Sequence, residues 1–166
     1  SCLAAVVEVA QVRSHDIAQR DVDRVLKLTA QSEDSLYGSL GEGYVYEYTS
    51  RDVKCSMDYA AVGKRFWEAL GYELYGLICD RARRQPQDWV EDLISGDVRN
   101  LAIGVVAAIA SEYNVSLGIA VPAAALVIKK GVGAYCSHPP KHPPQKPLKT
   151  MLAEKRARAT AARKRE

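Results

Sequence analysis

The chain has 166 residues, of which 48% are hydrophobic and 26% are charged, which is close to the average for globular proteins. This length fits one domain with a sizeable core, or one domain plus a tail, and excludes an array of several domains. The net charge of +3 conceals a strong asymmetry. Residues 1–136 carry 14 Lys and Arg against 18 Asp and Glu, whereas residues 137–166 carry 9 against 2. The sequence therefore predicts an acidic body followed by a strongly basic tail.

The N-terminal part of the chain predicts one helix between two short strands. Residues 4–12 alternate in polarity, which indicates a strand, with a helix as the alternative. An apolar stripe at helical spacing predicts a helix over residues 15–31. Glycines break the next stretch, and alternating tyrosines predict a second strand over residues 43–50. These tyrosines could stack on nucleic-acid bases, but packing against the core is the preferred interpretation because few cations lie among them.

The rest of the body predicts four helices, for which caps and helix-breaking residues set the limits. They cover residues 58–80, 86–95, 98–113 and 116–135. The predicted fold class is therefore mainly α: a compact domain of about five helices, with one or two short strands near the N-terminus. This domain spans residues 1–136, and a Pro-rich spacer (137–147) and a basic tail that could be helical (148–166) follow it.

Two apolar runs, residues 101–110 and 115–128, raise the question of a membrane hairpin. Each run is shorter than the roughly 20 apolar residues that a helical span requires, and Glu112, Asn114 and Pro122 interrupt the combined stretch. We therefore expect a buried helical hairpin in the core. The alternative is a membrane-associating or membrane-active module of the type that bacterial effectors use.

The cysteines indicate a reducing environment. Cys2, Cys55, Cys79 and Cys136 form no C-x-x-C pair, and no secretory signal is recognisable at the N-terminus. The sequence thus predicts a cytoplasmic protein whose cysteines act as small apolar residues. Cys136 lies close to His138 and His142, but a structural zinc site requires four ligands, so neither a metal nor another cofactor is expected.

No sequence motif for catalysis is present. The chain contains no P-loop, no nucleophile elbow and no zinc-protease signature. The glycines of "GSLGEGYV" lack the order of a dinucleotide fingerprint and predict a turn instead. The sequence favours a non-enzymatic protein, and a small enzyme with an unrecognised site is the second alternative.

The segment that follows the body is rich in proline. Two P-x-x-P patterns involve Pro140, Pro143, Pro144 and Pro147. Such a segment favours a polyproline II rod, which can act as a spacer or dock into the aromatic groove of a proline-recognition domain. The spacer is the preferred interpretation because this pattern is common wherever proline is abundant.

The last nineteen residues carry seven of the nine cations that follow residue 136. The candidate anion-binding residues are Lys149, Lys155, Arg156, Arg158, Arg163, Lys164 and Arg165. They could contact the phosphates of nucleic acid or an anionic membrane surface, and a merely solubilising tail is the alternative. Together the patterns predict a binding or adaptor module whose acidic body recognises a protein partner and whose tail binds a polyanion, with nucleic acid favoured. The oligomeric state stays open.

Overall fold

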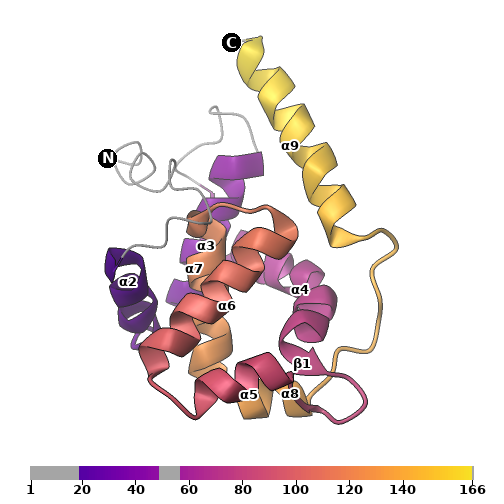
Figure 1. Cartoon of the computed structure of the whole chain (residues 1–166). Coiled ribbons are helices and arrows are strands. Elements are labelled where there is room, and N and C mark those ends of the chain that lie inside the picture. The colour runs from indigo at the N-terminus through magenta and orange to yellow at the C-terminus, as the bar shows by residue number, and fades with distance from the viewer. Residues whose placement is uncertain (1–18, 49–56, 166) are drawn as a thin grey trace.

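The computed structural model describes residues 19–48 and 57–165, which form a helical bundle with one very short two-stranded sheet (Figure 1). The helices are α2 (Gln19–Thr29), α3 (Glu33–Tyr48), α4 (Tyr59–Ile78), α5 (Asp88–Ile94), α6 (Val98–Tyr113), α7 (Leu117–Lys130), α8 (Val132–Ser137) and α9 (Leu148–Lys164). Strands β1 (Cys79–Asp80) and β2 (Gln85–Pro86) pair antiparallel. The predicted mainly helical fold class is confirmed.

Helix α7 lies at the centre of the bundle and packs against α2, α3 and α6. Its residues 117–127 are all buried, so the helix is covered on every side and not along one stripe only. The apolar runs of the sequence thus form α6 and α7, and the expectation that they belong to the core is confirmed for α7 along almost its whole length. No helix in the described part of the chain is long and apolar enough to cross a membrane.

The strand predicted over residues 43–50 is wrong as far as the structure describes it, because α3 continues as a helix to Tyr48. Residues 49–50 and the strand predicted over residues 4–12 lie outside the described residues. Tyr44 and Tyr48 are four residues apart and share one side of the helix, where their rings are 5.3 Å apart. The alternation that resembled a strand is therefore also compatible with a helix, and tertiary packing decides between them.

Glycines that looked like chain breakers lie where α3 meets its neighbours. A Cβ atom added to Gly41 would stand 1.9 Å from the carbonyl oxygen of Tyr59, and one added to Gly63 would stand 1.8 Å from that of Tyr37. Helices α3 and α4 are therefore in backbone contact, and Cα–H···O contacts are typical of such crossings. The glycines permit the close approach instead of ending the helix.

A third glycine joins α3 to α7. Pro122 has no N–H, so the carbonyl oxygen of Gly118, four residues earlier, lacks its helical donor. A Cβ atom at Gly43 would stand 2.2 Å from this oxygen, so the backbone of α3 covers it. Pro122 thus leaves the Gly118 carbonyl without its helical donor, and Gly43 allows the backbone of α3 to pack directly against that carbonyl.

The later helix boundaries follow local signals, with two differences. The side chains of Asp58 and Asp97 accept hydrogen bonds from the first turns of α4 and α6, and Asn114 ends α6 with a φ of 50°. The helix predicted over residues 116–135 is divided in two at Gly131, whose φ is 82°. Pro86, expected in the first turn of a helix, lies instead in β2.

Candidate polyanion-binding surface

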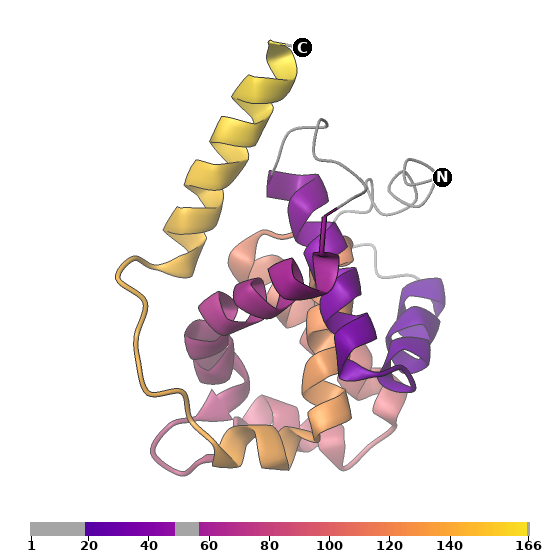
Figure 2. The ribbon, with the colours of Figure 1, turned by 180° about the vertical axis from the view of Figure 1, so that it is seen from behind.

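Helix α9 lies at one edge of the molecule, and one side of it is attached to the body (Figure 1). Figures 1 and 2 show the segment that follows α8 running along the side of the bundle to the start of α9. Leu148 and Leu152 are fully buried, and Ala159 is buried on the same side of the helix. The Leu148 N–H, one of the donors without a partner within the helix, donates to the carboxylate of Glu73 at 2.9 Å.

Arg156 forms the main polar contact between α9 and the body. Its guanidinium lies 2.5 Å from the carboxylate of Glu47, and it also donates to the hydroxyl of Tyr48 and to the carbonyl of Asn114. The Glu47 side chain is only 14% exposed and also accepts the Ser116 N–H at the start of α7. One carboxylate thus holds α9 and the first residues of α7 against α3. Charge-assisted contacts with such shielding are stronger than exposed ion pairs.

Two further cations of α9 contact Tyr44 and Tyr46 of α3. The Lys155 ammonium donates to the hydroxyl of Tyr44 and lies 5.2 Å from its ring centre. The Arg163 guanidinium donates to the carbonyl of Tyr46 and lies 5.7 Å from its ring centre. With Arg156 over the ring of Tyr48, each of the three tyrosines therefore receives one cation from α9.

The other four predicted cations point away from these contacts. They are Lys149, Arg158, Lys164 and Arg165. All four are exposed, and none of their side chains forms a hydrogen bond or ion pair with a described residue. The structure thus divides the seven candidate residues into three that bind the body and four that remain available to an anion.

Residues 138–147 of the Pro-rich segment form no helix or strand, and Ser137, the first residue of the predicted spacer, is the last residue of α8. Pro143, Pro144 and Pro147 are exposed, whereas Pro140 is half-buried. The φ and ψ of Pro147, −53° and 134°, are near polyproline II values. Lys146 forms an ion pair with Glu154 at 2.9 Å, which ties the end of the segment to α9. Both interpretations of these prolines, spacer and docking motif, stay predictions.

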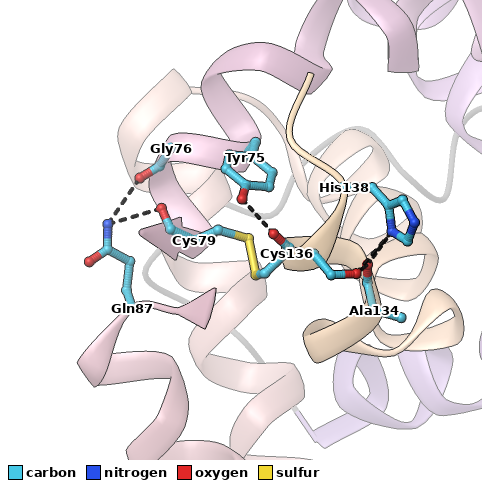
Figure 3. Close-up of a disulfide and its surroundings, with 8 residues drawn as sticks. Tyr75, Gly76, Cys79, Gln87, Ala134, Cys136 and His138 are labelled. Atoms are coloured by element: carbon cyan, nitrogen blue, oxygen red, sulfur yellow. Dashed lines mark hydrogen bonds between the residues drawn. A yellow bond between two sulfur atoms is a disulfide. The ribbon is translucent and has the colours of Figure 1, made fainter. Parts of the chain in front are cut away.

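The structure overturns the expectation that all cysteines are reduced. Cys79 and Cys136 form a disulfide with a Cα–Cα distance of 5.4 Å, between the end of α4 and α8 (Figure 3). The Tyr75 hydroxyl donates to the Cys136 carbonyl, and the Gln87 amide donates to the Cys79 carbonyl. The sequence could not identify this pair, because four cysteines allow three pairings. Cys2 and Cys55 lie outside the described residues.

The disulfide also bears on metal binding. The sulfur of Cys136 is no thiolate, so the cluster of Cys136, His138 and His142 lacks its only sulfur ligand. Within residues 19–48 and 57–165, no three His, Cys, Asp or Glu side chains are grouped so that they could hold a metal ion.

Burial raises the pKa of three tyrosines well above the usual value of about 10, and we expect alkaline pH to destabilise the fold. They are Tyr48, Tyr113 and Tyr135. Near Tyr48 the carboxylate of Glu47 raises the pKa further, while Arg156 opposes the rise. Because the folded state favours the neutral phenol, the stability from these groups is complete below pH 10 or so and is lost as pH rises further.

Urea unfolding at a series of pH values, compared with phenolate absorbance in the native protein, tests this prediction. Stability should fall above about pH 10, while these three tyrosines ionise only as the protein unfolds. Ionisation of every tyrosine near its usual pKa, with no loss of stability, would contradict it.

Comparison of the chain with protein families, with curated proteins and with solved structures found no match.

Proposed function

We propose that the protein is a non-enzymatic binding module in which the outward cations of α9 bind a polyanion, most favourably nucleic acid, while the acidic body recognises a protein partner. One observation carries the proposal: Lys149, Arg158, Lys164 and Arg165 are exposed and have no partner among the described residues. We call these four residues the outer cations.

The docking of α9 supports the role of the outer cations. Leu152, Arg156 and the other inward residues attach the helix to the body, so the outer cations extend from an ordered helix. Ordering a flexible tail on binding costs free energy and lowers the affinity for a ligand. A polyanion that contacts the outer cations does not incur this cost, because α9 is already ordered. Phosphate contacts release counterions, so four of them predict a slope of log affinity against log salt of about −3.6 on duplex DNA.

The membrane alternative has less support than nucleic acid binding. Its hairpin would need the apolar side chains of α7, and these contact α2, α3 and α6. No arrangement of residues in the described part of the chain favours the enzyme alternative. The cytoplasmic setting stays a prediction, and the Cys79–Cys136 disulfide favours an oxidising compartment instead.

Fluorescence anisotropy with labelled duplex DNA, at several salt concentrations, tests the proposal on the full chain. A variant with the outer cations replaced by Gln should lose at least about tenfold in affinity at low salt and most of its salt slope. The matched control replaces four exposed cations elsewhere by Gln and changes the net charge equally. They are Arg20, Arg24, Lys27 and Lys64.

Retained affinity in the control would support the proposal. Equal losses in both variants would contradict it, because the net charge alone would then govern binding. Tighter binding to vesicles with anionic lipid than to DNA would replace nucleic acid by a membrane surface as the partner of α9.

A further inference from the structure

Large exposed apolar side chains are concentrated on α5 and α6. Within residues 19–48 and 57–165, four of the five such side chains lie between positions 89 and 103. They are Trp89, Ile94, Val98 and Ile103, with exposed fractions of 36%, 44%, 47% and 38%. Single exposed apolar residues are common on protein surfaces, but four within one pair of adjacent helices are a local concentration, and two of them, Trp89 and Ile103, belong to the surface described below.

The solvent side of α6 carries no charge over three turns. Residues three and four apart on this side are all apolar, small or neutral, and they are half-buried or exposed: Asn100, Ile103, Gly104, Ala107 and Ser111. No other described helix crosses in front of α6 in Figure 1. The outer side of α6 is thus uncharged, and Ile103 is the large apolar side chain that it exposes.

Helix α5 adds an aromatic side chain to this surface. A Cβ atom on Gly104 would stand 2.4 Å from Cδ1 of Leu93 and 3.9 Å from the ring of Trp89, so both side chains lie against α6 there. We call the surface formed by Trp89, Leu93, Ile103, Gly104 and Ala107 the α5–α6 face. It combines a large aromatic side chain at one end with small side chains along the helix.

Helices α5 and α6 carry more acidic than basic residues. Between residues 85 and 128 the acidic residues are Asp88, Glu91, Asp92, Asp97 and Glu112, and Arg99 is the only cation. Arg99 is already paired with Asp23 at 2.8 Å. Asp88 is paired with Arg83. Asp92, three residues from Trp89 and on the same side of α5, is exposed, as is Glu91 elsewhere on the helix, and neither forms an ion pair with a described residue.

We infer that the α5–α6 face docks an amphipathic helix of a protein partner that carries an apolar side flanked by Lys and Arg. The short side chains of Ala107 and Ser111 allow a second helix to approach α6 beyond the part that Leu93 covers, and Trp89 provides an aromatic anchor of the kind that dominates binding energy. The acidic residues of α5 and α6 favour a basic partner and repel both nucleic acid and anionic lipid. This inference rests on the part of the proposed function that gives the body a protein partner, and it is independent of the outer cations.

Trp89 makes the inference testable by fluorescence. The sequence has two tryptophans, so Trp67→Phe leaves Trp89 as the single reporter in the full chain. The probe is a synthetic amphipathic helix built of Leu and Lys, compared with one built of Leu and Glu. We expect the Lys peptide to shift the Trp89 emission to the blue in a saturable titration and the Glu peptide to cause no shift.

Two Lys substitutions in this background locate the binding. Ile103→Lys places a positive charge on the α5–α6 face and should weaken binding of the Lys peptide about tenfold or more. Ala153→Lys adds the same charge on the exposed side of α9 and should leave the affinity unchanged. Circular dichroism confirms that both variants fold, and both should bind duplex DNA with at least the affinity of the parent.

Three results would overturn the inference. Equal emission shifts with both peptides would show binding without charge selection. Equal weakening by the two Lys substitutions would show that only the net charge matters. Self-association of the chain that Ile103→Lys abolishes would make the face an interface between copies. The peptide titrations do not depend on whether the outer-cation variant loses DNA binding. Failure of the DNA-binding proposal and failure of this inference can therefore be told apart.

Discussion

Replacing Cys79 and Cys136 together by Ala is expected to lower the free energy of unfolding by about 4 kcal/mol. The two residues are 57 positions apart, and the disulfide restricts the unfolded chain by closing a loop of that length. Both side chains are buried, and Ala keeps the site apolar, so no unsatisfied polar group is added. For a chain of this size, the melting temperature should fall by roughly 8–16 °C.

Urea unfolding of the wild-type chain and the double variant, each with and without reductant, measures this effect. Reductant should destabilise the wild-type chain to about the level of the variant and leave the variant unchanged. A variant within about 1 kcal/mol of the wild-type chain would contradict the prediction, since loop closure would then contribute little. A variant that still responds to reductant would assign the effect to Cys2 and Cys55.

The disulfide also affects the path of the chain to α9. It fixes α8 against the end of α4, immediately before the Pro-rich segment begins (Figure 3). Helix α9 then returns to α3, where Arg156 meets Glu47. The Pro-rich segment is thus anchored at both ends: at the first by the disulfide and by the hydrogen bond from Tyr75 to Cys136, and at the second by the contacts of α9.

The elements that the sequence predicted well are those with local signals. Helices α4 and α6 begin at Asp58 and Asp97, whose side chains cap the first turn, and α6 ends at Asn114. Such signals involve only the residues within one turn of the helix end. They therefore give the helix boundaries without any knowledge of the tertiary fold.

The elements that it missed depend on contacts between distant residues. In the sequence alone, Gly43 indicates a turn. In the fold it lies within α3 and allows contact with α7, because the backbone of Gly118 lies against it. The disulfide likewise requires the folded positions of α4 and α8. For the tail, charge alone predicted the cations but not which of them face the body. The spacing of Leu148, Leu152 and Ala159 was the signal that could have separated the inner from the outer side.

Gly63→Ala is expected to lower the free energy of unfolding by about 1–3 kcal/mol, although Ala favours helices. The new methyl group would stand 1.8 Å from the carbonyl oxygen of Tyr37 and close to the backbone of Gly41. Backbone atoms cannot rotate away as a flexible side chain can, so α3 and α4 must move apart. The separation weakens packing along the whole crossing and outweighs the gain in helix propensity of about 1 kcal/mol.

Gly71→Ala is the matched control because it lies in the same helix and has no neighbouring atom within 4 Å of the added methyl group. It should raise the free energy of unfolding by about 0.5–1 kcal/mol, since Ala loses less backbone entropy on folding than Gly. Urea unfolding of the two variants should therefore give changes of opposite sign. Changes of the same sign would mean that the α3–α4 crossing does not depend on backbone contact at Gly63, and that helix propensity or the unfolded state sets both results.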